Sequence, residues 1–187
     1  MACTLRRYEV TGSGFKKLSL LYGAVRKKNA QRMFFLINKD RDYLSQWLGW
    51  PKYSKQPSDY AEFAVLALKL YAEGKALPGC IEYRGVLVGA AGFNTIESPL
   101  KRAEIGYWLA SDYQGRGIMT RVCRKLIDIA FNELQLEKVQ LSAAEENLSS
   151  RAVAERLGMR LEGIITNAEA IDDRIVNHAV YGLLRSD

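Results

Sequence analysis

Histidine and cysteine are scarce in this sequence. His178 is the single histidine, and the three cysteines share no spacing typical of metal ligands. Because the chain offers no His/Cys cluster for zinc and no obvious Ser-His or Cys-His pair, we expect a metal-free protein. No run approaches ~18 consecutive apolar residues, which argues against a transmembrane helix, and residues 1–17 lack the apolar segment of a secretory signal. These absences predict a cytoplasmic protein without a membrane partner.

The composition is otherwise that of an ordinary globular domain. The 187 residues are 48% apolar and 26% charged, which is enough to build one hydrophobic core. The charge is uneven, since residues 1–60 hold 12 Lys/Arg against 4 Asp/Glu and the remainder holds 15 against 17. A basic N-terminal third favours an anionic partner such as a nucleotide, RNA or an acidic peptide, and it fits a solvated surface equally well.

Local patterns divide the chain into strands and helices. The linker-like run at residues 11–14 marks residues 1–14 as a flexible arm or as the junction to an upstream domain, and residues 15–187 as one domain. We expect strands at residues 18–25, 76–83, 86–95, 102–110, 138–143, 161–165 and 175–184. We expect helices at residues 28–37, 42–47, 58–73, 118–134 and 147–157. This order predicts one mixed α/β (α+β) sheet and not a doubly wound repeat.

The segment between the strand at 102–110 and the helix at 118–134 carries the clearest binding signal. Gly115, Arg116 and Gly117 directly precede the helix. Glycines let the backbone approach a ligand closely, and a helix N-terminus presents free N–H groups and the positive end of the dipole. The segment therefore predicts a pyrophosphate site that is neither a Walker loop nor a dinucleotide fingerprint. A turn that only connects strand to helix is the alternative.

The same segment resembles a family signature. Gln114-x-x-Gly117-x-Met119 is similar to the Gln/Arg-x-x-Gly-x-Gly/Ala signature of the GNAT N-acetyltransferases, which bind acetyl-CoA through this loop. Residues 43–51, 103–109 and 147–159 are similar to the RimJ/RimL branch, which acetylates α-amino groups. Met119 stands where the family usually has Gly or Ala. Its side chain would turn into the core while its backbone N–H still faces phosphate.

The resemblance implies the GNAT fold and acetyl-CoA as cosubstrate. That fold is a single mixed, mostly antiparallel sheet of six to seven strands with helices on both faces. Its fourth and fifth strands, here residues 102–110 and 138–143, would splay apart to admit the pantetheine arm. The residues that the resemblance assigns to acetyl-CoA are Trp108, Leu109, Gln114, Gly115, Arg116, Gly117, Ile118, Met119, Thr120 and Asn147.

The implied reaction is direct attack of a neutral amine on the acetyl thioester. Glu104 is the expected base, acting through water, because it shares a strand face with Trp108; an exposed glutamate in a surface pair is the alternative. Ser150 is expected to donate to the CoA thiolate and Asn147 to hold the pantetheine, although both residue types are ordinary at a helix N-terminus. Many other GNAT enzymes use a tyrosine in this region, and residues 147–159 contain none.

Aromatic residues between the first helices and the second strand indicate the acceptor. Trp50 and Phe63 are the pair expected to stack on a nucleobase, with core packing as the alternative. Within that branch, the combination resembles the acetyltransferase domains of microcin C self-immunity proteins, which acetylate the α-amine of a processed aminoacyl-adenylate. We therefore predict an aminoacyl-nucleotide acceptor, antibiotic self-immunity, and a place in a longer multidomain chain. The alternatives are acetylation of a ribosomal protein N-terminus and, in another class, a non-catalytic acyl-CoA- or RNA-binding module.

Overall fold

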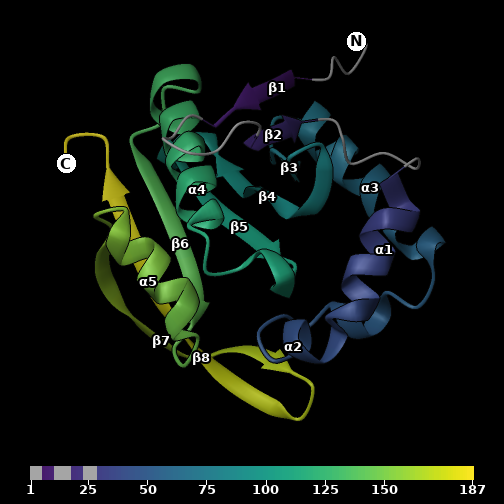
Figure 1. The fold of residues 1–187 in the computed structure, drawn as a ribbon. Helices are drawn as coiled ribbons and strands as arrows, with labels where there is room; N and C mark the ends of the chain where they lie inside the picture. The colour runs from purple at the N-terminus through teal and green to yellow at the C-terminus, as the bar shows by residue number, and fades with distance from the viewer. Residues whose placement is uncertain (1–5, 11–17, 23–28) are drawn as a thin grey trace.

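One sheet organises the protein. The computed structural model describes residues 6–10, 18–22 and 29–187. Over these ranges eight strands form a sheet in the order β1-β2-β3-β4-β5-β6-β8-β7 (Figure 1). All neighbouring pairs are antiparallel except β5 and β6, which are parallel. The strands are β1 Arg6–Glu9, β2 Leu18–Tyr22, β3 Gly79–Tyr83, β4 Val86–Glu97, β5 Arg102–Leu109, β6 Lys138–Ala144, β7 Arg160–Ile171 and β8 Arg174–Leu184.

Helices cover both faces of this sheet, as the GNAT fold requires. They are α1 Ala30–Lys39, α2 Arg41–Ser45, α3 Pro57–Ala72, α4 Ile118–Asp128 and α5 Leu148–Arg156, with a π-helical extension of α4 over Ile129–Glu133. One core packs α4 and α5 against residues such as Ile105 and Leu141. A second core packs α1 and α3 against Cys80 and Trp108 on the other face. Alternate residues of β5 therefore enter different cores.

The apolar spacing expected for the long helix is correct over most of its length. Ile118, Val122, Leu126 and Ala130 are at most 1% exposed, which confirms the four-residue periodicity. Leu134 does not follow the pattern, because it lies just beyond the π-helical extension and is 40% exposed. A π-helical turn changes the angular spacing of side chains, so the apolar stripe leaves the core there.

Strand β1 adds an edge strand within the range expected to be an arm. Arg6–Glu9 pairs antiparallel with β2, and Tyr8 packs against the core and donates a 2.8 Å hydrogen bond from its hydroxyl to Glu133. The sheet consequently has eight strands over the described residues, one more than the upper expectation of seven. The other residues of the range 1–14, apart from Val10, lie outside the described residues.

The central strands β5 and β6 diverge, which confirms the expected splay. Residues 102–105 of β5 pair with residues 138–141 of β6. Beyond that point β5 pairs only with β4, and β6 pairs only with β8. A β-bulge at Asn94 of β4 lies opposite the position where pairing stops, and bulges bend a strand and increase its twist. The divergence leaves two unpaired strand edges facing a V-shaped opening in the sheet.

Two further features bear on the kind of protein. No helix within the described ranges is long and apolar enough to cross a membrane. The same ranges hold no group of three or more His, Cys, Asp or Glu side chains arranged to hold a metal ion.

Candidate active site

The loop before α4 has the backbone geometry of an anion site. Gly115 and Gly117 adopt φ values of 69° and 65°, a left-handed conformation that favours glycine. Gly117 is the N-cap of α4 and supplies no side-chain cap. The first N–H groups of a helix have no intrahelical acceptor, so the N–H groups of Ile118, Met119 and Thr120 are available to a ligand.

Polar side chains hold this loop in place. Gln114 donates a 3.1 Å hydrogen bond from its side-chain amide to the carbonyl of Leu109 at the end of β5. Arg116 donates to the carbonyl of Asp112 at 2.8 Å, and its guanidinium lies 5.7 Å from the ring centroid of Tyr113. The side chains of Gln114 and Arg116 thus shape the loop in this structure, while the backbone presents the N–H groups.

Two arginines that the sequence analysis did not select also lie at this helix terminus. Arg121 donates to the carbonyls of Arg116 at 2.7 Å and of Gly117 at 3.1 Å. Arg156 of α5 donates to the hydroxyl of Thr120 at 3.3 Å. Arg121 lies near the loop because it is one turn into α4. Arg156 lies near it because α5 packs beside α4. Cationic groups here complement a polyanionic ligand.

The unusual methionine of the signature fits the fold without distortion. Met119 is 8% exposed and Ile118 is 1% exposed, and both pack in the core beneath α4. The side chain of Met119 therefore turns away from the loop surface, as expected from its apolar character. A bulky residue at this position leaves the N-terminus of α4 open.

Ser150 lies in the first turn of α5 and contacts β5 beyond the last pair of β5 with β6. Asn147 is the N-cap of α5 and accepts a 3.1 Å hydrogen bond from the backbone N–H of Ser150. The hydroxyl of Ser150 lies 2.7 Å from that of Tyr107 on β5. The structure thus supplies a tyrosine next to Ser150 from a strand, not from the helix where the sequence analysis looked for one.

Glu104 occupies the opposite face of β5 from Tyr107. It shares that face with Gly106 and Trp108, and Trp108 packs in the core under α1 and α3. A Cβ atom on Gly106 would lie 2.1 Å from the side-chain amide of Asn94, so a side chain at this position would displace Asn94 from the strand. Among the described residues no hydrogen bond or ion pair engages the Glu104 carboxylate, which leaves it available to a substrate or a water.

The two aromatic residues expected at the acceptor side contact different rings. Trp50 lies 6.2 Å from Trp108, centroid to centroid, with the ring planes at 58°. Phe63 of α3 lies 6.0 Å from Tyr60. Trp50 is 39% exposed and Phe63 is 56% exposed, so part of each side chain remains accessible. Trp50 packs on the core residue Trp108, and the stacking role of both rings stays a prediction.

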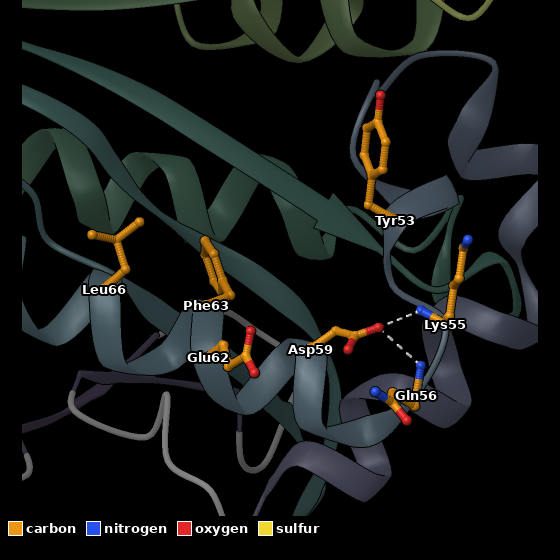
Figure 2. Close-up of a pocket in the computed structure, with 7 residues that line it drawn as sticks. All are labelled: Tyr53, Lys55, Gln56, Asp59, Glu62, Phe63 and Leu66. Carbon is orange, nitrogen blue, oxygen red and sulfur yellow. Dashed lines mark hydrogen bonds between the residues drawn. The ribbon is translucent and has the colours of Figure 1, made fainter.

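An open pocket of about 590 Å³ lies beside Phe63 (Figure 2). Tyr53 follows Pro51 in a short helical turn, and Phe63 and Leu66 project from α3. Asp59 accepts hydrogen bonds from the backbone N–H groups of Lys55 and Gln56 at 2.7 and 3.1 Å. Trp50 is not among the lining residues. The residues that line this pocket are Tyr53, Lys55, Gln56, Asp59, Glu62, Phe63 and Leu66.

A buried carboxylate ties the acceptor-side helices to the end of β5. Asp40, between α1 and α2, is 7% exposed. It accepts hydrogen bonds from the backbone N–H and the hydroxyl of Ser111, both at 2.7 Å. Because Ser111 begins the segment that leads into the glycine loop, Asp40 links the two sides of the site.

Cys123 is excluded as a nucleophile by its surroundings. It lies in α4 and is 0% exposed, and burial raises the pKa of its thiol far above the usual range. A thiol that is neutral and inaccessible cannot attack a thioester. Among the described residues, the cysteines are both buried, so none of them is accessible as a nucleophile.

Comparison with known proteins agrees with this geometry. Residues 20–160 match the model of the acetyltransferase (GNAT) domain family. The chain is 33% identical over 161 residues to the putative ribosomal N-acetyltransferase YdaF of Bacillus subtilis (strain 168), covering 86% of this chain and 88% of that protein. It is 32% identical over 155 residues to the ribosomal-protein-serine acetyltransferase of Escherichia coli (strain K12), covering 83% and 87%.

The fold also matches a solved complex. The crystal structure of the Microcin C7 self immunity acetyltransferase MccE with acetyl-CoA and AMP superposes with a TM-score of 0.85 at 29% identity, covering 94% of this chain and 98% of that chain. The splayed strands, the glycine loop and the family match lead to one conclusion. The chain belongs to the GNAT acetyltransferase family and is an acetyl-CoA-dependent N-acetyltransferase.

Proposed function

We propose that this enzyme transfers the acetyl group of acetyl-CoA to the α-amino group of an aminoacyl-nucleotide. The observation that carries the proposal is the exposed indole of Trp50, held on Trp108, on the sheet face that also carries Glu104. An exposed aromatic ring offers a stacking surface for a nucleobase, worth about 1–3 kcal/mol. Acetylation removes the charge of the α-amine. Acetylating a toxic aminoacyl-nucleotide would thereby confer self-immunity in the cytoplasm, where translation takes place.

The cofactor loop and the strand opening would hold acetyl-CoA. The open N–H groups at the start of α4 suit the pyrophosphate, because the loop glycines remove side chains from its path. Arg116, Arg121 and Arg156 supply positive charge around it. The divergence of β5 and β6 supports entry of the pantetheine arm, whose amides can pair with the unpaired strand edges. Asn147 would lie beside that arm.

The two faces of β5 divide the catalytic work in this proposal. Glu104, on the acceptor face, takes a proton from the attacking amine through a water molecule. A free α-amine has a pKa of about 7.7–8.0, so modest assistance is enough near neutrality. Ser150, in α5 next to Tyr107 on the other face of β5, donates a hydrogen bond to the sulfur of the departing CoA. Attack and departure thus take place from opposite sides of one strand.

The N-terminal α-amine of a ribosomal protein is the second candidate acceptor. Two relatives that cover most of the chain carry ribosomal proteins in their names, at 33% and 32% identity. The chemistry at Glu104 and Ser150 is unchanged, because both acceptors present an α-amino group. Only the surface that receives the rest of the acceptor differs.

Labelled acetyl-CoA offered with each acceptor tests the proposal. The acceptors are an aminoacyl-sulfamoyl adenosine and a peptide that copies a ribosomal-protein N-terminus, and the controls are the same molecules with the α-amine already blocked. We expect label on the nucleotide with a higher kcat/KM than on the peptide. A higher value on the peptide would favour the ribosomal acceptor, and binding of acetyl-CoA without transfer to any amine would indicate a non-catalytic module.

A further inference from the structure

We infer that Tyr107 is a positioning residue for Ser150, which it orients so that the serine hydroxyl donates to the CoA sulfur. This inference rests on the role of Ser150 in the proposed function. The two hydroxyl oxygens lie 2.7 Å apart although the residues are 43 positions apart in sequence. Tyr107 is the second residue of β5 beyond the last pair with β6, so the contact lies at the opening of the sheet.

Ser150 is held from more than one direction. Its backbone N–H donates to the side chain of Asn147 at 3.1 Å, which fixes the first turn of α5. Its hydroxyl meets the phenol of Tyr107, which also lies 3.5 Å from the Ser150 carbonyl. A serine side chain has three staggered orientations. The contact with Tyr107 selects one of them.

Tyr107 and Ser150 each carry a hydroxyl proton, so either group can donate across this contact. Burial raises the pKa of the Tyr107 phenol well above its usual range, so the group keeps its proton at neutral pH. The ionisable groups that act on it are Cys123, Arg156 and Tyr43, and the thiol of Cys123 is itself neutral. When the phenol donates to the Ser150 oxygen, the serine proton is directed to another acceptor. Hydrogen bonds arranged in such a chain strengthen one another.

The reaction step balances without any additional reactant. The amine nitrogen forms a bond to the acetyl carbon, the C–S bond breaks, and its electron pair stays on sulfur. The Ser150 hydroxyl donates a hydrogen bond to that sulfur and keeps its proton. One amine proton leaves through the water on Glu104 to solvent, and sulfur takes one proton from solvent to give the CoA thiol.

Titration of the bound CoA thiol tests the inference without an acceptor. Thiolate formation is followed by ultraviolet absorbance in protein saturated with CoA, and protein saturated with desulfo-CoA serves as the blank. The variants are Ser150→Ala, Tyr107→Phe and the control Tyr181→Phe. Tyr181 is 2% exposed and its hydroxyl also bonds to α5, accepting from Arg151 at 2.9 Å and donating to Glu155 at 3.1 Å. The control therefore loses a comparable buried hydroxyl contact to the same helix.

We expect the bound thiol to titrate at lower pH in the wild type and in Tyr181→Phe than in Ser150→Ala and Tyr107→Phe. We also expect Tyr107→Phe to lower kcat about 3- to 10-fold, with KM for acetyl-CoA nearly unchanged. If the bound thiol titrates at the wild-type pH in Tyr107→Phe but at a higher pH in Ser150→Ala, the inference about Tyr107 is overturned and the proposed role of Ser150 stands. A wild-type titration in Ser150→Ala would overturn the proposed role of Ser150 and the inference with it.

A second measurement keeps the test decisive if Tyr107→Phe folds poorly. Protein labelled with ¹³C at the tyrosine ring reports the Cζ resonance of Tyr107 by NMR. We expect this resonance to move when CoA is added to the wild type and to move far less in Ser150→Ala, because the serine transmits the change. Equal movement in both proteins would contradict the coupling between the two hydroxyls.

Discussion

The indole of Trp50 lies against that of Trp108, with ring centroids 6.2 Å apart and ring planes at 58°. Trp108 is 9% exposed and belongs to the core between the sheet and α1 and α3. A tilted ring pair of this kind stabilises by about 0.5–1.5 kcal/mol beyond the buried area. Trp50 is thereby held in a defined position while part of its surface remains open to a ligand.

Replacing Gly117 by valine should weaken CoA binding by at least about tenfold, because a β-branched residue resists φ of 65° and puts a side chain beside the ligand path. Gly74→Val is the matched control, since Gly74 has φ of 70° and open space around it at the end of α3. Both variants should lose similar stability in thermal unfolding. Calorimetry should show weaker CoA binding only for Gly117→Val. Equal CoA affinities in Gly117→Val and Gly74→Val would show that the loop does not bind CoA.

Glu104→Gln should slow acetylation most at low pH, where less of the α-amine is neutral and proton removal limits the rate. Above the pKa of the amine the loss should diminish. Glu137→Gln, at a surface residue paired with Lys101, serves as the control. The measurement is kcat/KM across pH with one acceptor. A Glu104→Gln profile of wild-type height and shape would exclude this carboxylate from the mechanism.

Asp40→Ala should destabilise the protein by about 1–3 kcal/mol, because the backbone N–H and the hydroxyl of Ser111 lose the buried carboxylate that accepts their hydrogen bonds. Asp42→Ala is the control. Asp42 is the exposed second residue of α2, so its loss should change stability by less than about 0.5 kcal/mol. Chemical denaturation of both variants measures the difference. An Asp40→Ala variant as stable as Asp42→Ala would show that the link between α2 and the loop contributes little.

Local signals were sufficient to predict the glycine turn before α4 and the core helix that follows it. The glycines of the loop, the four-residue spacing from Ile118 onward and the inward turn of Met119 all follow from neighbours in sequence. Strand β1 could not be predicted, because its four residues include two arginines and show no clear alternation of apolar and polar side chains. Its stability comes from pairing with β2 and from the hydroxyl of Tyr8 on Glu133.

Long-range partners explain what else the sequence analysis missed. Alternation along β5 assigns Tyr107 and Glu104 to opposite faces, but no local pattern says that α5 brings Ser150 to Tyr107. Likewise, Asp40 and Ser111 are 71 residues apart. The pairing of Trp50 with Trp108 depends on how the second core closes over the sheet, which spacing along the chain does not encode.

The acceptor is the central claim, and aromatic variants test it on two substrates. Trp50→Ala and Phe63→Ala are assayed for acetyl-CoA binding, and for kcat/KM on an aminoacyl-sulfamoyl adenosine and on a ribosomal-protein N-terminal peptide. Phe35→Ala is the matched control, because Phe35 of α1 is 56% exposed, as is Phe63. Acetyl-CoA affinity should be unchanged in all three variants.

The decisive measurement is the ratio of the two kcat/KM values in Trp50→Ala relative to wild type. Loss of one stacking face should lower kcat/KM on the nucleotide acceptor roughly 5- to 150-fold, and the peptide should be affected far less. The ratio should therefore fall in Trp50→Ala and stay at the wild-type value in Phe35→Ala. An equal loss on both acceptors, or activity on the peptide alone, would contradict an aminoacyl-nucleotide acceptor.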